Sequence, residues 1–187
     1  NFAVTSNMYS QDGIGVHPTE NLAVNSFGSE SFGNPQDTYL ANYYSLKATN
    51  NLISGGYYGI AISSSASARD TGIVIENNTI NQVSYYGINV NCLTNLKLKK
   101  NKVSLRPSAD LKSAGYYLQN ISTSSPGNIE ITFNYVTGAG QYGIYMNAVI
   151  GTGAPTNRSV NVSNNMIAGG FFSNKTASVD LPQGLSI

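Results

Sequence analysis

The chain has 187 residues, of which 41% are hydrophobic and only 10% are charged, and its formal net charge is +1. This content is too apolar for a disordered chain, and the small number of Lys and Arg residues argues against a nucleic-acid partner. No apolar stretch approaches the roughly 18 residues of a membrane-spanning helix. No window keeps a helical period for three turns, so we expect an all-β chain with essentially no long helix.

A glycine recurs at a fixed spacing along the chain. The series contains Gly13, Gly59, Gly87, Gly115, Gly143 and Gly170, and from Gly59 onward the spacing is 28, 28, 28 and 27 residues. Each glycine is followed by a short alternating apolar stretch, which predicts a strand with every second side chain directed inward. The predicted strands begin at Ile14, Ile60, Ile88, Tyr116 and Ile144, with a weaker one at Phe171. A constant period of this size indicates stacked repeats, and we expect each glycine to mark a corner with unusual backbone angles.

A second motif, apolar-x-apolar-x-x-Asn-x-apolar, supplies the other half of each repeat. It occurs at 46–53, 73–80, 96–103, 129–136 and 160–167, around Asn51, Asn78, Asn101, Asn134 and Asn165. The pattern predicts a strand, a turn at Asn and a second short strand. Stacking would bring these asparagines into one column, with each side-chain amide bonded to the next turn of the chain. We therefore expect a structural role for both the Asn and the Gly columns.

The two motifs together resemble the repeat of the right-handed parallel β-helix proteins. Tyr86-Gly87-Ile88-Asn89-Val90, with Ile73 to Ile80 before it, is a close instance, and the resemblance extends from about Gly13 to Ile167. It implies one all-β domain over 1–187, a single-stranded right-handed parallel β-helix (solenoid) of about six coils of roughly 28 residues. The irregular stretch 28–41 is predicted to be an insertion between coils. The pectate-lyase-like superfamily and phage tailspikes share this coil, as do polysaccharide-degrading enzymes and surface adhesins, so the fold does not decide the activity.

Tyrosines recur at the outward positions of the predicted Gly strands. Alternation directs outward Asn89, Tyr117 and Tyr145, and the position before the glycine holds Tyr58, Tyr86 and Tyr142. An aromatic, nearly uncharged strip of this kind suits contact with the apolar faces of sugar rings, while amides bind hydroxyl groups. We predict these six residues, together with Arg69, as substrate-binding residues. Packing of the strip against a loop or a neighbouring subunit is an equally good alternative.

Candidate catalytic residues are few, because the chain contains only nine acids. Glycoside hydrolysis needs two carboxylates roughly 5 to 9.5 Å apart, and no two acids here are near neighbours in sequence. Asp12 lies beside the first glycine corner. Asp70 lies in the loop after Ile62, where it could approach His17 and Glu20 from the corresponding loop of the first coil. The predicted catalytic set is therefore Asp12, His17, Glu20 and Asp70, although each of them also fits an ordinary solvated loop position.

Basic residues gather at 97–106, and Lys97 and Lys99 are predicted to lie on the outer face of one strand. This patch could hold an acidic polysaccharide or be an ordinary solvated strand face. No acidic cluster has the spacing of calcium ligands, so we expect no metal and no cofactor. The single cysteine, Cys92, cannot form a disulfide within the chain.

We interpret the chain as a polysaccharide-binding and polysaccharide-degrading β-helix of the phage tailspike type, extracellular or on a virion surface and assembled as a homotrimer. The alternatives are a non-enzymatic β-helical adhesin or structural spike, and a secreted monomeric polysaccharide lyase or hydrolase. The expected partners are a polysaccharide or oligosaccharide, with no nucleic acid and no membrane span. Uncovered ends would expose unpaired strands, so we expect a segment of a larger chain, or ends that other domains or subunits cover.

Overall fold

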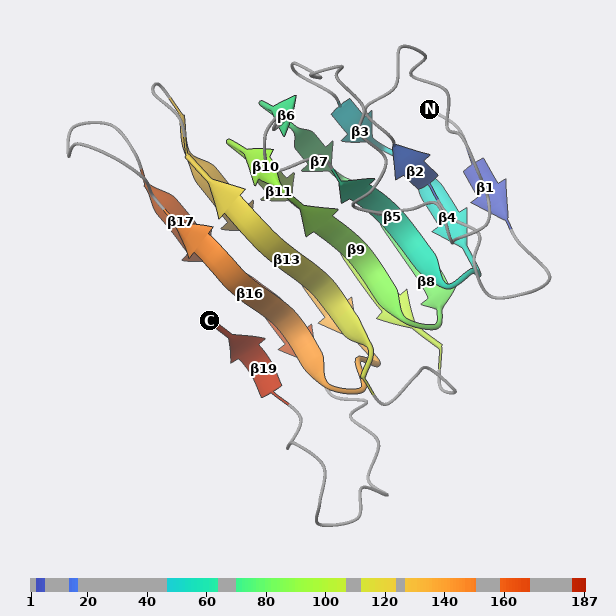
Figure 1. Ribbon diagram of the computed structural model, residues 1–187. Helices are drawn as coiled ribbons and strands as arrows, with labels where there is room; N and C mark the ends of the chain where they lie inside the picture. Colours follow the sequence, from blue (N-terminus) through green and yellow to red (C-terminus); the bar gives the residue numbers. More distant parts are fainter. Residues whose placement is uncertain are drawn as a thin grey trace.

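A computed structural model of the chain describes residues 3–5, 14–16, 47–63, 70–106, 112–123, 127–150, 159–168 and 183–187. Within these residues the chain forms nineteen strands and no helix. All the strand pairings recorded among them are parallel. In Figure 1 the strands of successive turns of the chain lie side by side and point the same way. The predicted insertion at 28–41 lies outside the described residues.

The strands form three sheets. Sheet 1 contains β2 (Ile14–Val16), β5 (Tyr58–Ser63), β9 (Tyr86–Asn91), β13 (Ala114–Ser122), β16 (Tyr142–Ile150) and β19 (Gln183–Ser186), joined by the short strands β6 (Asp70–Thr71) and β10 (Leu93–Thr94). Sheet 2 contains β3 (Lys47–Thr49), β7 (Val74–Glu76), β11 (Lys97–Lys99), β14 (Ile129–Thr132) and β17 (Val160–Ser163). Sheet 3 contains β1 (Ala3–Thr5), β4 (Leu52–Ser54), β8 (Thr79–Val83), β12 (Lys102–Leu105), β15 (Tyr135–Thr137) and β18 (Met166–Ala168).

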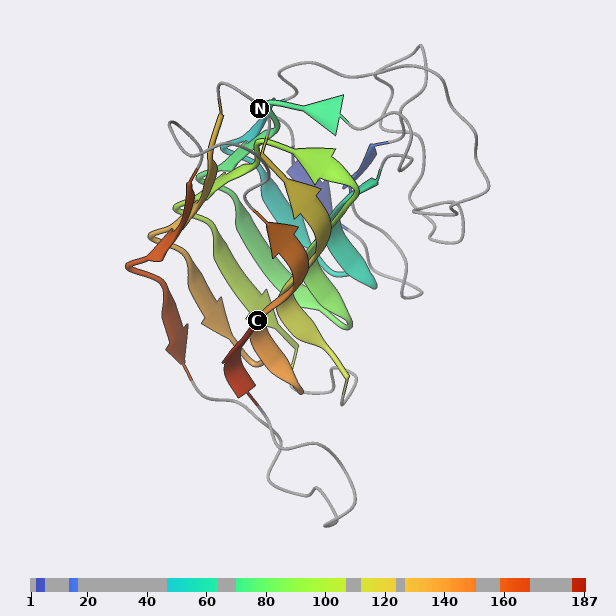
Figure 2. The same cartoon turned by 60° about the vertical axis from the view of Figure 1, so that its left-hand side comes forward.

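One turn of the chain visits all three sheets before it returns one strand further on. From β7 in sheet 2 the chain passes the Asn corner into β8 in sheet 3, continues as β9 in sheet 1, and reaches β11 beside β7. The turned view in Figure 2 shows the sheets facing different directions around a common axis. This winding is a parallel β-helix, so the predicted all-β solenoid is confirmed.

The core is a stack of inward apolar side chains that the strand register aligns. Ile60, Ile88, Tyr116 and Ile144 occupy equivalent positions of neighbouring strands in sheet 1, and all four are buried. Tyr116 is fully buried, and its hydroxyl donates a hydrogen bond of 3.1 Å to the carbonyl oxygen of Asn101. Burial raises the pKa of this phenol well above its ordinary value. The alternation read from the sequence therefore places the core correctly.

The recurring glycines are required by close packing between strands. A Cβ atom on Gly87 would lie 2.2 Å from Cγ1 of Val103 and 2.6 Å from the carbonyl oxygen of Gly115, and the same crowding recurs at Gly59, Gly115 and Gly143. None of these four glycines is among the residues of positive φ. The expectation of unusual backbone angles at the Gly column is therefore wrong, because the space for a side chain is what is missing.

The last strand of sheet 1 shows which glycine follows Gly143 in the Gly column. Strand β19 pairs with β16, with Gln183 opposite Tyr142, so that Gly184 follows Gly143 in the stack. The carbonyl oxygen of Gly184 lies 2.5 Å from a Cβ built on Gly143. Gly184 and not Gly170 thus continues the column. Gly13, Gly170 and Phe171 lie outside the described residues.

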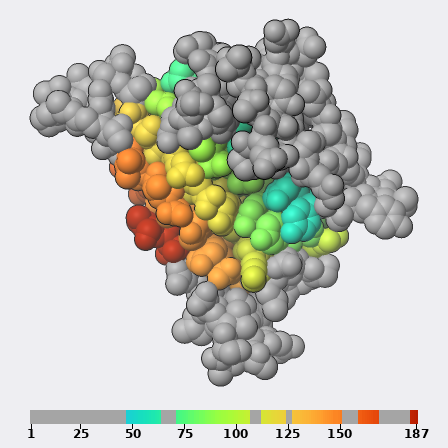
Figure 3. Space-filling model, in the orientation of Figure 1, coloured from blue at the N-terminus to red at the C-terminus, as the bar shows by residue number. Residues whose placement is uncertain are grey.

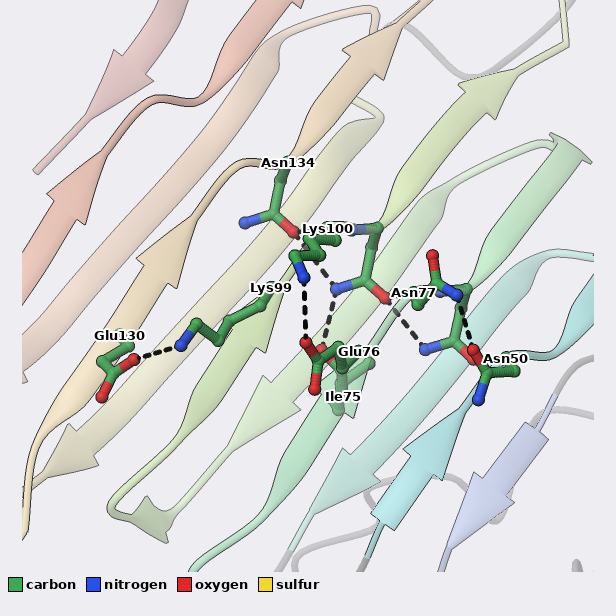
Figure 4. Close-up of polar contacts among 10 residues, drawn as sticks. Asn50, Ile75, Glu76, Asn77, Lys99, Lys100, Glu130 and Asn134 are labelled. Atoms are coloured by element: carbon green, nitrogen blue, oxygen red, sulfur yellow. Dashed lines mark hydrogen bonds and ion pairs between the residues drawn. The ribbon is translucent and has the colours of Figure 1, made fainter.

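The asparagine column forms a hydrogen-bonded ladder through the corner between sheets 2 and 3. The side-chain oxygen of Asn101 accepts from the backbone N–H of Asn78 at 3.0 Å and from its amide Nδ2 at 2.9 Å. The amide of Asn101 donates to Oδ1 of Asn134 and to the carbonyl oxygen of Ile75. The same arrangement links Asn51 to Asn78 and Asn134 to Asn165. Figure 4 shows part of this corner, with Asn134 and Ile75 labelled. The structural role predicted for the column is confirmed.

The residue before each ladder asparagine makes the turn, with a left-handed backbone. These residues are Asn50, Asn77, Lys100, Phe133 and Asn164, with φ between 54° and 58°. A side chain with a Cβ is disfavoured in this conformation, and asparagine tolerates it best after glycine. Phe133 is therefore the least suitable residue in the column, and its side chain is exposed.

We expect Phe133→Asn to raise the free energy of unfolding by about 0.5–1 kcal/mol, because asparagine fits the left-handed conformation and little buried packing is lost. Urea denaturation of the two chains measures the difference. Phe133→Ala is the matched control, because it removes the ring but does not supply a side chain suited to this backbone. An equal gain from both substitutions would contradict the conformational explanation.

Candidate functional site

The outer face of sheet 1 carries tyrosines in two aligned columns. One column runs through Tyr58, Tyr86 and Tyr142, with Ala114 between the last two, and the other runs from Asn89 through Tyr117 to Tyr145. Tyr57 and Tyr85 lie just before β5 and β9. We call the seven tyrosines the tyrosine ladder: Tyr57, Tyr58, Tyr85, Tyr86, Tyr117, Tyr142 and Tyr145. The structure thus brings together the six predicted substrate-binding residues of this face, and Figure 3 shows the face from outside.

Neighbouring rings of the tyrosine ladder stack on one another. The ring centroids are 4.3 Å apart between Tyr86 and Tyr117 and 4.7 Å apart between Tyr117 and Tyr145, with interplanar angles of 8° and 14°. Tyr57 stacks on Tyr85 at 4.6 Å, and Tyr85 lies 4.1 Å from Tyr86 with its ring tilted. The three stacked pairs join neighbouring coils, and their separations are close to the spacing of about 4.8 Å between parallel strands. The rings therefore form a row of two stacks along the helix axis, Tyr57 with Tyr85 and Tyr86 with Tyr117 and Tyr145, which meet within one coil at Tyr85 and Tyr86.

This stacking changes the contact that the ladder can offer to a ligand. A ring packed between two others has both of its faces occupied, so its accessible parts are the ring edge and the hydroxyl group. The amide of Gln119 donates a hydrogen bond of 3.0 Å to the hydroxyl oxygen of Tyr117, which adds a polar group to the same row. The expected contact with sugar faces is thus limited to the ends of the row, and edges and hydroxyl groups supply the rest.

Three phenol groups of the ladder, those of Tyr58, Tyr86 and Tyr117, are held in the neutral form. Burial raises the pKa of Tyr58, Tyr86 and Tyr117, and at Tyr86 a side-chain hydrogen bond with Tyr85 and the charges of the neighbouring tyrosines raise the pKa further. A neutral phenol both donates and accepts hydrogen bonds. These three tyrosines are therefore suited to binding hydroxyl groups and are poor general bases for a lyase reaction.

The predicted catalytic set falls mostly outside the described residues. Asp12, His17 and Glu20 lie outside the described residues, and so does Arg69, which was predicted to bind the ligand. Asp70 begins β6 and pairs with Leu93, but its side chain is not among those described. The carboxylates whose side chains are described belong to Glu76 and Glu130, both in sheet 2. Among the described side chains, sheet 1 thus presents no carboxylate beside the tyrosine ladder.

The described part of the chain offers no obvious metal site: no three His, Cys, Asp or Glu residues there lie together. The same part holds no helix of the length and hydropathy needed to cross a bilayer. Cys92 is buried and is not in a disulfide.

The outer face of sheet 2 is charged. Lys97 and Lys99 point outward, as predicted, and Glu130 in the next strand lies between them in space, 3.8 Å from Nζ of Lys97 and 2.7 Å from Nζ of Lys99. The hydrogen bond from Lys99 lowers the pKa of Glu130, and the same bond raises the pKa of Lys99. Lys102 belongs to sheet 3 instead, with its ammonium 5.9 Å from the ring centroid of Tyr135.

The basic patch predicted at 97–106 from the sequence was therefore incomplete, because it did not include Lys47. Strand register places Lys47 opposite Val74, which is in turn opposite Lys97, so Lys47 joins the charged face from fifty residues away. The signal that could have found it is the Asn motif, since Lys47 and Lys97 both lie four residues before a ladder asparagine.

Comparison with protein families confirms the fold class and its handedness. Residues 38–181 match the family described as the right handed beta helix region. Comparisons with curated proteins and with solved structures gave no match. The chain belongs to the right-handed β-helix family.

Proposed function

We propose that this chain is a polysaccharide-binding β-helix whose ligand lies along the tyrosine ladder of sheet 1. The observation that carries the proposal is the row of tyrosines, formed by two adjoining stacks, on a face where no described side chain is charged. The row follows the helix axis and repeats at the strand spacing, so it matches a long linear ligand better than a compact one. Neutral phenols and the amides of Asn89 and Gln119 supply hydrogen bonds to sugar hydroxyl groups.

The enzymatic form of the proposal is a depolymerase of the phage tailspike type that acts on a bacterial surface glycan. Its catalytic residues are Asp12, His17, Glu20 and Asp70, with Arg69 as a ligand contact. Its assembly is a homotrimer, whose packing would cover part of the tyrosine-rich surface. The molar mass in solution distinguishes this trimer from a secreted monomeric enzyme. Incubation with bacterial surface polysaccharides, followed by chain length and by absorbance from new double bonds, distinguishes hydrolase from lyase.

A non-enzymatic adhesin or spike is the second candidate. It is favoured by the fact that the described carboxylates of Glu76 and Glu130 lie on sheet 2 and pair with lysines, which leaves the ladder face without a described acid. In this form the chain binds the glycan without shortening it.

Tyr117→Ala should weaken polysaccharide binding about tenfold or more, because it removes the central ring and separates Tyr86 from Tyr145. Loss of one aromatic contact worth about 1.4 kcal/mol corresponds to a tenfold change in the dissociation constant. Affinity is measured on immobilised polysaccharides drawn from a panel of bacterial capsules and O-antigens. Tyr117→Phe keeps the stack and removes only the hydroxyl group, so it separates ring contact from hydrogen bonding. Tyr135→Ala, on sheet 3, is the matched control. Equal binding by wild type and Tyr117→Ala would contradict the proposal.

A further inference from the structure

Sheet 2 carries a groove that the proposed function does not use. The groove has a volume of about 600 Å³ and is lined by β3, β7, β11 and the corner residues that follow them. It lies on a different sheet from the tyrosine ladder, so its ligand contacts are separate. Its lining combines four lysines and one carboxylate, that of Glu76, with hydroxyl, amide and apolar side chains.

The groove has an excess of positive charge. Lys47, Lys97, Lys99 and Lys100 supply four ammonium groups, and the carboxylates of Glu76 and the adjacent Glu130 leave a net charge of +2. Only Lys99 makes an ion pair at hydrogen-bond distance with these acids, since Lys97 lies 3.8 Å from Glu130 and Lys100 lies 3.9 Å from Glu76. Figure 4 shows Lys99 directed at Glu130 and Lys100 directed at Glu76.

Three ammonium groups in the groove therefore remain available to an anion. The side chains of Lys97 and Lys100 are 49% and 62% exposed, and Lys47 is exposed. No ion pair of Lys47 with an acid is recorded in the described part of the chain. Exposed ion pairs contribute little to stability, so a ligand anion can compete with the two longer contacts at small cost.

The positions of the lysines favour a polymer over a single anion. Lys47 and Lys97 occupy the same register position two strands apart, with Val74 between them. With a strand spacing of about 4.8 Å, the two backbone positions are separated by roughly 10 Å along the helix axis. A chain with regularly spaced acidic groups can meet both lysines with their side chains extended, whereas one carboxylate meets both only if the two flexible side chains bend toward it.

The remaining lining residues favour a sugar over a nucleic acid. Val74 offers an apolar floor between the lysines, and Thr49, Asn50 and Asn77 offer hydroxyl and amide groups on either side. The described lining contains no aromatic ring on which a base could stack and no arginine. Single-stranded nucleic acids are held largely by such stacking.

We propose that the groove of sheet 2 is a second binding site, specific for a linear acidic polysaccharide lying along the helix axis. Lys47 and Lys97 bind successive acidic groups, and Lys100 binds from the corner. Val74 and the amides of the corner contact the sugar rings between those groups. The site is independent of the tyrosine ladder.

The test uses hyaluronan oligosaccharides, which carry one carboxylate on every second sugar, with glucuronate and carboxyl-reduced hyaluronan as matched probes. The intact chain should bind hyaluronan in a salt-sensitive manner and bind neither control probe appreciably. Lys47→Gln combined with Lys97→Gln should weaken hyaluronan binding by about tenfold or more, the equivalent of roughly 1.4 kcal/mol. Lys102→Gln, on sheet 3, should change it less than about twofold, within the effect expected of a distant exposed charge.

Three results would overturn the proposal: equal binding of the carboxyl-reduced polymer, equal weakening by Lys102→Gln, or tighter binding of a single-stranded oligonucleotide of the same charge. The variant Tyr117→Ala distinguishes binding in the groove from binding to the tyrosine ladder. Retained hyaluronan binding by this variant supports an independent groove. If Tyr117→Ala abolishes hyaluronan binding while the double lysine variant does not, the acidic chain binds the ladder and the groove proposal fails.

Discussion

Asn101→Ala is expected to lower the free energy of unfolding by about 3–4 kcal/mol, which is a large share of the stability of an ordinary domain. The backbone N–H of Asn78 is buried in the corner and donates only to Oδ1 of Asn101 among the recorded bonds. Alanine leaves this donor without an acceptor and also removes the bonds to Ile75 and Asn134. Each unsatisfied buried group costs about 1–3 kcal/mol.

Asn165→Ala is the matched control for this substitution. Asn165 makes the same type of bonds to Asn134 and Ile131, but it is only partly buried, so water can replace part of what is lost. We expect a loss of about 1 kcal/mol at this position. Chemical denaturation followed by far-UV circular dichroism measures both variants. A loss near zero at Asn101 would show that the asparagine ladder does not stabilise the stack, and equal losses at Asn101 and Asn165 would show that burial does not set the size of the effect.

Gly87→Ala is expected to destabilise the coil by about 3 kcal/mol or more, at the upper end of overpacking effects. The new methyl group would lie 2.2 Å from Cγ1 of Val103, which is fully buried, and 2.6 Å from the carbonyl oxygen of Gly115. The second contact is with backbone, so β9 and β13 would have to separate and weaken the hydrogen bonds between them.

Gly184→Ala gives the matched control, because the nearest atom to its Cβ is 4.0 Å away, in Ile167. We expect no measurable loss at Gly184. The double variant Gly87→Ala with Val103→Ala should recover only part of the loss at Gly87, since the clash with the Gly115 carbonyl oxygen remains. Thermal unfolding of the four chains tests the explanation. Full recovery in the double variant would show that the side-chain contact alone requires glycine, and similar losses at Gly87 and Gly184 would contradict the steric argument.

The fold could be predicted from the sequence because a stack of parallel strands places similar residues at the same position in each coil, and this produces a regular repeat. The Asn motif and the Gly spacing therefore predict where the sheets and the core lie. The cause of the Gly column was assigned wrongly, because a glycine that leaves room for Val103 looks the same in sequence as one with positive φ. The positive φ belongs to the residue before the asparagine, where residue types as different as Asn77, Lys100 and Phe133 give no recognisable pattern.

The candidate sites could be predicted only in part, for related physical reasons. Alternation gave the outward tyrosines, but whether their faces stack or remain free depends on side-chain rotamers. The column after Gly143 could not be followed by spacing, because the connection between β18 and β19 is longer than the equivalent connections between β8 and β9, β12 and β13, and β15 and β16. The partnership of Lys47 with Lys97 depends on strand register and not on distance along the chain.

The most direct test of the central claim is hydroxyl-radical footprinting of the intact chain with and without a bacterial surface polysaccharide that it retains. We predict lower labelling of Tyr117 and Tyr145 in the complex, because the ligand covers their exposed edges, and unchanged labelling of Tyr135 on sheet 3. Unchanged labelling of Tyr117 and Tyr145, with protection elsewhere on the chain, would show that the tyrosine ladder is not the polysaccharide-binding surface.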